Sequence, residues 1–190
     1  MKKYNIIYAD PPWMETGGGK IKRGADRHYP LMKTKDICAL PINQIADNNC
    51  HLYLWTTNAF LPDALKVMEA WGFTYKTMIT WVKDKIGLGQ YFRGMSEHCL
   101  FGVKGNLPYK TDVEGKRMQG RTAFYAPKSV HSKKPDEMRE MIHLVSDREN
   151  IKKIELFARE KNNGWDVLGY DVNEGDIKLA LQKMIYEMEN

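Results

Sequence analysis

Apolar residues follow two spacings along the chain, and the two spacings alternate. Short apolar runs rich in β-branched and aromatic residues predict strands, because runs of that length favour strands over helices. These runs lie at residues 5–9, 51–55, 73–82, 97–103, 152–158 and 165–168. Apolar residues at helical spacing predict helices at residues 34–40, 58–71, 135–145 and from about 175 onward. Strands that alternate with helices predict an α/β fold with a mostly parallel sheet and helices on both of its faces.

The predicted helix at residues 58–71 carries a clear apolar stripe. Its core face is expected to be formed by Leu61, Ala64, Leu65, Met68 and Trp71. Asn58 is expected to cap its first turn, as Thr34 is for the preceding helix, because short polar side chains accept hydrogen bonds from the free N–H groups there. The segments between the predicted elements lack the Pro/Ser composition of a linker, so a single domain over residues 1–190 is expected.

The first predicted strand ends in the sequence Asp10-Pro11-Pro12-Trp13, which is the main candidate for chemistry. Asp10 is expected at the carboxyl end of the strand, where open α/β sheets bind ligands. Pro11 and Pro12 have a fixed φ and no N–H, so their carbonyls are expected to be rigid and without partners. Trp13 adds a flat apolar face with one N–H donor, which suits stacking on an aromatic ligand.

A carboxylate, a free carbonyl and a stacking ring together favour a planar base that carries an exocyclic amine. Such an amine is a poor nucleophile because its lone pair is delocalised into the ring. Two acceptors that bind both amine hydrogens would aim the lone pair at an electrophilic methyl group. These residues do not by themselves distinguish adenine from cytosine. The alternative is a buried strand that ends in an ordinary Pro-Pro turn with a core tryptophan.

The composition is that of a globular protein. The chain has 190 residues, of which 43% are hydrophobic, enough for a sizeable core. No apolar run reaches membrane-spanning length and no signal peptide precedes the first predicted strand, so a cytoplasmic protein is expected. The odd number and wide spacing of Cys38, Cys50 and Cys99 indicate reduced core thiols. The histidines also lack ligand spacing, and no metal site is predicted.

Much of the positive charge, in a chain of formal net charge +5, lies in two turn-rich segments, residues 14–35 and 104–134. Such segments favour nucleic acid as a partner, because phosphate contacts dominate nucleic-acid affinity. A solvated basic surface is the alternative. The glycines of the first segment predict either a mobile flap beside Asp10 or an ordinary surface loop, and their spacing does not match a Walker loop. The candidate nucleic-acid contacts are Lys20, Lys22, Arg23, Arg27, Lys116, Arg117 and Arg121.

Lys134 comes immediately before the helix predicted at residues 135–145. A lysine beside the unpaired N–H groups of a helix start can receive a carboxylate. The alternative is a solvated lysine at a helix end. Surface positions are likewise the alternative for Glu155 and Arg159, which belong to the strand predicted at residues 152–158 and to its end.

Six segments of the chain, in order, resemble the sequence blocks of the MT-A70 family of adenine-N6 methyltransferases. They are Asp10-Pro11-Pro12-Trp13, Leu52-Tyr53-Leu54-Trp55-Thr56-Thr57-Asn58, Trp81-Val82-Lys83, Glu97-His98-Cys99-Leu100-Phe101-Gly102-Val103-Lys104-Gly105, His131-Ser132-x-Lys134-Pro135-Asp136 and Lys153-Ile154-Glu155-Leu156-Phe157-Ala158-Arg159. The resemblance implies a Rossmann-like class I methyltransferase fold that uses S-adenosylmethionine. It also implies a permuted segment order, with the catalytic strand first and the cofactor-binding strand near the C-terminus.

The resemblance further implies roles for individual residues. The target amine would be held and stacked by Asp10, Pro11, Pro12 and Trp13. The cofactor would be bound by Asp10, Ser132, Lys134, Glu155, Phe157, Arg159 and Asn162, with Lys134 on its methionine carboxylate. Many relatives have Gly-Asn where this chain has Gly169-Tyr170-Asp171, so the ribose contact expected there is left open.

The resemblance and the basic segments together predict methyl transfer from S-adenosylmethionine to the N6 amine of adenine in nucleic acid. DNA is favoured over RNA because a compact chain without an accessory domain resembles prokaryotic and phage members. A base stacked in a duplex would have to leave the stack to reach Asp10. The alternatives are RNA or cytosine N4 as the target, a non-catalytic nucleic-acid-binding module, and a small-molecule amine methyltransferase. No oligomeric state is predicted.

Overall fold

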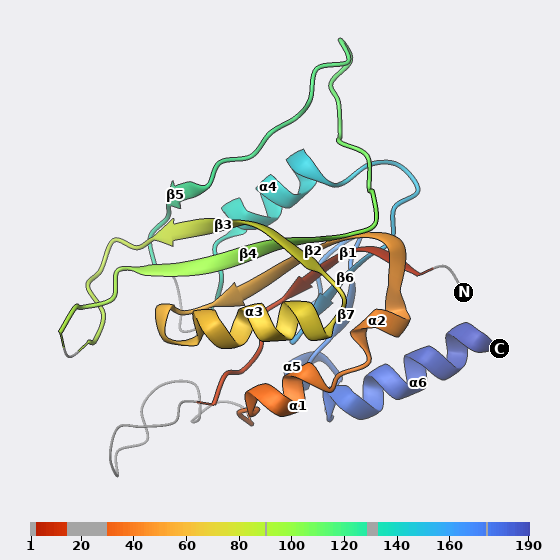
Figure 1. Cartoon of the computed structure of the whole chain (residues 1–190), viewed down its shortest axis with the longest axis horizontal. Helices are drawn as coiled ribbons and strands as arrows, with labels where there is room; N and C mark the ends of the chain where they lie inside the picture. The colour runs from red at the N-terminus through yellow and green to blue at the C-terminus, as the bar shows by residue number, and fades with distance from the viewer. Residues whose placement is uncertain (1–2, 15–29, 90, 129–132, 174) are drawn as a thin grey trace.

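A seven-stranded sheet forms the centre of the computed structural model, which describes residues 3–14, 30–89, 91–128, 133–173 and 175–190 (Figure 1). The strands follow one another across the sheet in the order β5-β3-β4-β2-β1-β6-β7. Their bounds are β1 Tyr4–Ala9, β2 Ala46–Thr56, β3 Thr74–Val82, β4 Ser96–Lys104, β5 Ala123–Tyr125, β6 Lys153–Leu156 and β7 Asp166–Leu168.

Strand directions confirm the predicted mostly parallel sheet. The pairs β1–β2, β1–β6, β3–β5 and β6–β7 are parallel. Only β4 runs against its two neighbours, β2 and β3. The start of β4 therefore lies at the same edge of the sheet as the ends of the other strands.

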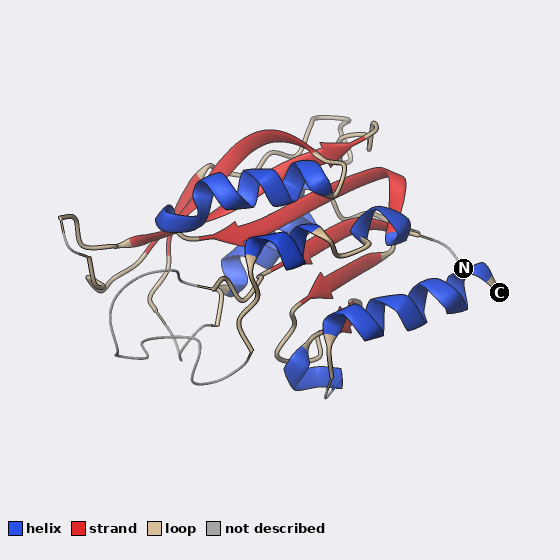
Figure 2. Ribbon diagram, turned by 60° about the horizontal axis from the view of Figure 1, so that its bottom comes forward, coloured by secondary structure: helices blue, strands red, loops and turns tan. Residues whose placement is uncertain are grey.

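Helices cover both faces of the sheet, as predicted (Figure 2). One face packs against helices α1 (Thr34–Cys38), α2 (Ile42–Ile45), α3 (Leu61–Ala70) and α6 (Ile177–Glu189). The other face packs against helix α4 (Asp136–Val145). A 3-10 turn, η2 (Asn58–Phe60), leads into α3, and the short helix α5 (Tyr170–Asn173) follows β7.

Strand β1 supplies both cores because successive side chains of a strand point to opposite faces. Ile7 and Ala9 lie in the core beneath α1, α3 and α6, whereas Ile6 and Tyr8 lie in the core beneath α4. All six residues of β1 are buried, as expected for a central strand with helices on both sides. The cysteines are free thiols, as predicted, with Cys50 and Cys99 buried and Cys38 partly exposed.

Two predictions about the helix starts are wrong. Asn58 does not cap α3, because α3 starts at Leu61 and the Asn58 Oδ1 atom lies 2.6 Å from His98 Nε2 on β4. Thr34 is the first residue of α1, and no side chain caps that helix. In both places the polar side chain that suggested a cap lies elsewhere than at the capping position.

The buried stripe of α3 also differs from the prediction at two positions, Leu65 and Val67. The buried residues are Ala64, Val67, Met68 and Trp71, whose spacing keeps them on one face of the helix. Leu65 was expected in the core, but it is exposed because it lies outside that stripe.

The bounds of two strands differ from those that the apolar pattern of the sequence predicts. Strand β2 begins at Ala46, five residues earlier than predicted, through an exposed polar stretch. Strand β6 ends at Leu156, because Phe157 adopts a left-handed backbone with φ of 62° and cannot continue the ladder. Among the described residues, no helix is long and apolar enough to cross a membrane.

The close approach of Gly169, after β7, to the backbone of Ala158, after β6, provides a test of how these two segments pack. A Cβ atom on Gly169 would lie 2.0 Å from the Ala158 carbonyl oxygen, which is backbone and cannot turn away. We expect Gly169→Ala to lower the free energy of unfolding by about 2 kcal/mol, the usual size of an overpacking cost. The measurement is the midpoint of chemical denaturation.

Gly102→Ala is the matched control. There the added Cβ would lie 2.7 Å from the Met68 Sδ atom, the far part of a flexible side chain. We therefore expect a smaller loss than for Gly169→Ala. Equal losses in the two variants would contradict this account of Gly169.

Candidate active site at the carboxyl edge of the sheet

The carboxyl edge of the sheet between β1 and β6 is where the connections of the chain diverge. The chain leaves β1 toward β2 on one side and leaves β6 toward β7 on the other. Open α/β sheets bind ligands at such a topological switch point. Asp10 follows β1 directly, its N–H pointing to the Leu156 carbonyl at 3.4 Å, and the segment 157–159 follows β6.

An ion cluster surrounds Asp10. The ammonium of Lys134, just before α4, lies 2.7 Å from Asp10 Oδ2 and 3.2 Å from Glu97 Oε2. Lys83, immediately after β3, pairs with the other oxygen of Glu97. Glu97 reaches this edge because β4 is reversed, so that its start lies beside the ends of β2 and β3. Four charged side chains from four segments of the chain therefore meet at one place.

Two tryptophans form the apolar wall of this cluster. The Lys134 ammonium lies 5.3 Å from the centre of the Trp55 ring, and the Lys83 ammonium 4.8 Å from that of Trp81. These distances suit cation–π attraction, which is stronger where water is excluded. The Trp55 indole N–H donates to the Tyr8 hydroxyl at 2.7 Å, which fixes the ring.

Burial and neighbouring charges shift the pKa values of the cluster in different directions. Burial raises the pKa of Asp10, with a smaller upward effect from Glu97 and an opposing effect from Lys134 and Arg159. Burial also raises the pKa of Glu97, but Lys134 and Lys83 outweigh it, so that this pKa lies below its usual value. For Lys134, the two carboxylates outweigh burial and raise the pKa, so the lysine stays charged.

The prediction that the proline carbonyls lack partners is wrong. Pro11 O accepts the Trp13 N–H at 2.9 Å, and Pro12 O accepts the Met32 N–H at 2.8 Å. The two prolines still cannot donate, so the segment bends back on itself and recruits donors from nearby backbone. A carbonyl oxygen has two lone pairs, and each proline carbonyl therefore retains one for a ligand.

Trp13 is nearly buried, although the predicted stacking on a base needs an open face of its ring. Its side chain is 9% exposed, its N–H donates to Trp55 O at 3.1 Å, and its ring stacks on Phe60 with centres 5.6 Å apart. One face of the ring is therefore already covered. The contact between Trp13 and a base stays a prediction, and it would use the remaining face or edge of the ring.

A second cluster of polar side chains is centred on Glu155 of β6. Arg139 of α4 donates to both Glu155 oxygens, at 2.9 and 2.8 Å, and Asn162 donates to Oε2 at 3.0 Å. The Arg139 and Glu155 side chains are 15% and 12% exposed. Glu155 thus points inward, and the alternative of an outward surface position is wrong. Phe157 and Arg159 follow at the strand end, where Arg159 contributes to the electrostatic field at Asp10.

Several predicted residues lie away from this edge or outside the described part of the chain. Arg117 stacks over the Tyr109 ring at 4.3 Å, and Lys116 belongs to the turn held by Asp112. Arg121 lies nearer the carboxyl edge, since the next residue accepts the Thr80 N–H at 2.8 Å. The residues Lys20, Lys22, Arg23, Arg27 and Ser132, together with the predicted flap, lie outside the described residues.

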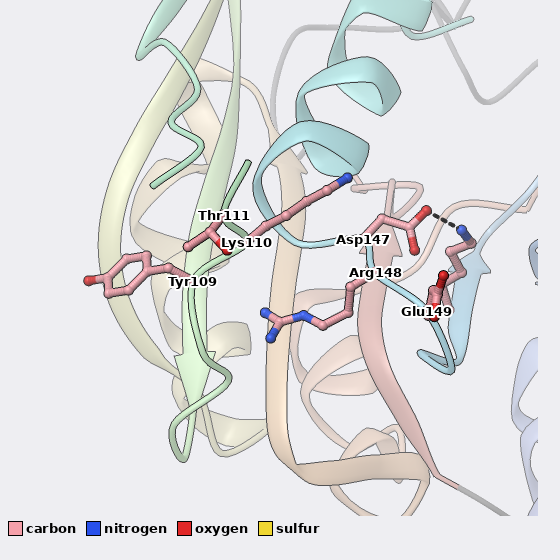
Figure 3. Close-up of a pocket in the computed structure, with 7 residues that line it drawn as sticks. Tyr109, Lys110, Thr111, Asp147, Arg148 and Glu149 are labelled. Carbon is pink, nitrogen blue, oxygen red and sulfur yellow. Dashed lines mark hydrogen bonds and ion pairs between the residues drawn. The ribbon is translucent and has the colours of Figure 1, made fainter. Parts of the chain in front are cut away.

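A cavity of about 650 Å³ lies at the other end of the sheet (Figure 3). It is lined by Tyr109, Lys110, Thr111, Asp147, Arg148, Glu149 and Lys153. Its cations are already engaged, with Lys153 paired to Asp147, Lys110 bound to His143 O and Arg148 bound to Pro108 O. The cavity contains none of the predicted site residues, so size alone does not make it the active site.

Sequence reasoning assigned no role to Glu97, Lys83 or Arg139. A signal existed for Glu97, because a carboxylate at the start of an apolar strand needs a partner once it is buried. The same logic applied to Glu155 predicts a cation but does not say which one. Arg139 lies 16 positions away in the sequence, and only the packing of α4 on the sheet brings it there.

The fold and the site together define an α/β protein with a cluster of charged side chains at the carboxyl edge of its sheet. Comparison with known sequences identifies it further: a model of the MT-A70 family matches residues 4–171. The chain belongs to the MT-A70 family, which confirms the resemblance seen in its motifs.

Three relatives illustrate the range of the similarity. The type II methyltransferase M.MunI of Mycoplasma sp is 30% identical over 98% of this chain and 85% of its own length. A probable N(6)-adenosine-methyltransferase MT-A70-like protein of Oryza sativa subsp. japonica is 31% identical over 90% of this chain and 23% of its own. The human N(6)-adenosine-methyltransferase catalytic subunit METTL3 is 30% identical over 88% and 28%. The chain thus spans about a quarter of the length of the last two.

The ion cluster predicts opposite titration shifts in two variants. Lys134→Met removes a cation that lowers the Asp10 pKa, so we expect that pKa to rise. Glu97→Gln removes an anion that raises it, so we expect the Asp10 pKa to fall. A 13C NMR titration of the Asp10 carboxyl carbon measures both shifts. Lys183→Met, at an exposed lysine of α6, is the control, and shifts of the same sign in the first two variants would refute the cluster.

The Arg139–Glu155 pair predicts a stability effect. Arg139→Met leaves the Glu155 carboxylate buried without its cation, so we expect a loss of about 2 to 4 kcal/mol in the free energy of unfolding. Adding Glu155→Gln should recover part of this loss, because the uncompensated charge disappears. Thermal and urea denaturation measure both. Lys183→Met, which breaks an exposed pair with Glu187, should change stability by less than about 1 kcal/mol. A double variant no more stable than Arg139→Met would argue against the pairing.

Proposed function

We propose that this MT-A70 protein transfers a methyl group from S-adenosylmethionine to the N6 amine of adenine in DNA. The observation that carries the proposal is the Asp10-Pro11-Pro12-Trp13 segment at the switch point of the sheet, held by Lys134 within the ion cluster. Adenine N6 is the target because the relatives that match most of this chain include several N(6)-adenosine-methyltransferases.

DNA is the proposed polymer because of how the relatives cover this chain. One relative that matches along most of both chains is a type II methyltransferase, an enzyme class that modifies DNA. The adenosine methyltransferases match only about a quarter of their own length. RNA remains the second candidate, supported by the names of those longer relatives.

The proposed fold is the Rossmann-like class I methyltransferase fold, formed by one domain over residues 1–190 and with a permuted segment order. The strand that carries Asp10 is first in the chain, and β6, with the proposed cofactor residues, comes near the end. The two strands are nevertheless direct neighbours, with Tyr8 opposite Glu155. Permutation changes the order of the segments in the chain and leaves the two halves of the proposed site adjacent.

The side chains at this edge fit S-adenosylmethionine by their chemistry. Its amino acid end carries one positive and one negative group, and Asp10 and Lys134 offer the complementary pair. Lys134 has three N–H donors and uses two of them on Asp10 and Glu97, which leaves one for a carboxylate. Glu155 offers carboxylate oxygens that can accept from ribose hydroxyls, and Asn162 donates to Glu155 Oε2 and so orients it. Phe157, Arg159 and Ser132 complete the proposed cofactor contacts.

The bound cofactor would supply a methyl group on a sulfonium, an electrophile that needs no covalent enzyme intermediate. The task of the protein is then to hold the adenine amine and shape its lone pair. Lys134 binds Oδ2 of Asp10, so Oδ1 can accept one amine hydrogen. The second lone pair of the Pro11 or Pro12 carbonyl can accept the other. Acceptors fixed before the reaction stabilise the positive charge that develops on the nitrogen.

The cluster also prepares Asp10 for the proton that the amine loses. Burial raises the Asp10 pKa, which makes this carboxylate a better proton acceptor than an exposed one. Lys134 opposes that effect through its contact with Oδ2 at 2.7 Å. Glu97 holds Lys134 in place from the other side, at 3.2 Å. Stacking by Trp13 and backbone contacts from Lys116, Arg117 and Arg121 are further parts of the proposal.

Asp10→Ala tests the function. We expect it to abolish transfer of labelled methyl from S-adenosylmethionine to adenine-containing DNA, by at least about a thousandfold, the scale of losing a preorganised electrostatic group. Asp36→Ala, an exposed aspartate of α1, is the control and should keep full activity. Circular dichroism checks that both variants are folded. Unchanged activity of Asp10→Ala would overturn the mechanism.

Parallel methylation of random-sequence DNA and RNA pools decides the polymer. Mapping the modified bases should show N6-methyladenine in DNA, and transfer to RNA alone would replace DNA by RNA in the proposal. Calorimetry of cofactor binding separates an enzyme from a non-catalytic module, because a module would bind nucleic acid without S-adenosylmethionine.

A further inference from the structure

The connection between β3 and β4, residues 84–95, exposes an unusual amount of apolar surface. Tyr91 and Phe92 are 93% and 91% exposed. Thirteen large apolar or aromatic side chains are exposed in the described residues, and this connection contains five of them, including these two. The five are Ile86, Leu88, Tyr91, Phe92 and Met95. Exposed apolar groups at this density usually mark a binding surface, because they lower solubility without stabilising the fold.

The described part of this connection is held in a defined shape. The Gly87 N–H donates to Gly94 O at 2.7 Å, and the Gly94 N–H donates to Leu88 O at 3.1 Å. Arg93 donates from its Nε atom to Gly87 O at 2.9 Å. These bonds close a narrow turn and present the aromatic side chains outward. Binding a partner therefore costs this connection less conformational entropy than it would cost a flexible loop.

The connection stands directly beside the proposed active site. It begins after Lys83 and ends just before Ser96 and Glu97, so its two ends carry two members of the ion cluster. Figure 1 shows it extending beyond the end of the sheet toward which the β1 and β2 arrows point. Asp84 accepts the Lys128 N–H at 2.7 Å, which ties the base of the connection to the segment that leads toward Lys134.

We propose that Tyr91 and Phe92 form an aromatic wedge that inserts into duplex DNA beside the target adenine and keeps that adenine out of the stack. The inference rests on the proposed function, and it adds the device that opens the duplex. An adenine in a duplex cannot reach Asp10 while it is stacked and paired. Apolar side chains inserted between base steps unstack them, and aromatic rings replace the lost stacking.

The charges of the connection favour nucleic acid over a second copy of this chain. Lys85 and Arg93 flank the aromatic side chains, and Lys128 adds a third cation at the base, against the single carboxylate of Asp84. This excess complements phosphate, whereas two copies meeting through the same surface would bring like charges together. Tyr91 and Phe92 are the most exposed of the large apolar and aromatic side chains in the connection, so the rings are accessible to bases while the flanking cations can bind the backbone.

The experiment compares three forms of one DNA site that the wild-type protein methylates. They are a fully paired duplex, the same duplex with a mismatch at the target adenine, and the single strand. The variants are Tyr91→Ala, Phe92→Ala and the double substitution. Tyr186→Ala is the matched control, because this tyrosine is 68% exposed on α6, a helix that packs on β7. Calorimetry of unfolding should show no change in any variant, since the side chains make little contact with the fold.

We expect the double substitution to lower kcat/KM on the paired duplex by about tenfold or more, the scale of losing stacking on one base. Activity on the mismatched duplex and on the single strand should fall by less than about threefold, because the unpairing cost is absent there. With 2-aminopurine at the target position, binding of the wild-type protein should raise its fluorescence, and binding of the double variant should not. Tyr186→Ala should match the wild type throughout.

Three outcomes would overturn the wedge. These are unchanged activity on the paired duplex, an equal loss on paired and single-stranded DNA, and a wild-type dimer that the substitutions convert to a monomer. If the wild-type protein methylates no DNA at all, the proposed function fails by itself. In that case the fluorescence comparison still decides whether the aromatic pair opens a duplex, so the two failures are distinguishable.

Discussion

The ion cluster of Asp10, Lys134, Glu97 and Lys83 is the interaction on which the site depends. Two carboxylates and two ammonium groups balance one another in a mostly buried place, where any one of them alone would be costly. The balance keeps Lys134 charged although burial opposes this. Burial also raises the pKa of Asp10, against the effect of Lys134, which favours the proposed role of this carboxylate in holding an amine and accepting its proton.

The reversed strand β4 makes this cluster possible. In a fully parallel sheet, the start of β4 would lie at the opposite edge, and Glu97 could not reach Lys134. Because β4 is antiparallel to both of its neighbours, its first residues join the ends of β1, β2 and β3. The same reversal places the 84–95 connection at this edge. One change of strand direction therefore supplies a charged residue of the site and the exposed aromatic pair beside it.

Arg139 and Glu155 extend the same principle to the neighbouring strand. Glu155 can lie inward on β6 only because α4 brings a guanidinium to both of its oxygens. The bidentate geometry fixes the carboxylate orientation as well as compensating its charge. Since the Asp10 and Glu155 strands are adjacent, the proposed amine site and the proposed cofactor site share the α4 face of the sheet.

The sequence by itself determined the α/β class, the approximate positions of six of the seven strands, and the location of Asp10 after a buried strand, whereas the short edge strand β5 was not predicted. It could do so because strand and helix periods, and proline's missing N–H, are local properties. The ends of β2 and β6, the failed cap at Asn58 and the partners of the proline carbonyls were decided by tertiary contacts. So were the partners of Glu97 and Glu155. Charge partners far apart in the chain become neighbours only through strand order and helix packing, and no local pattern encodes that pairing.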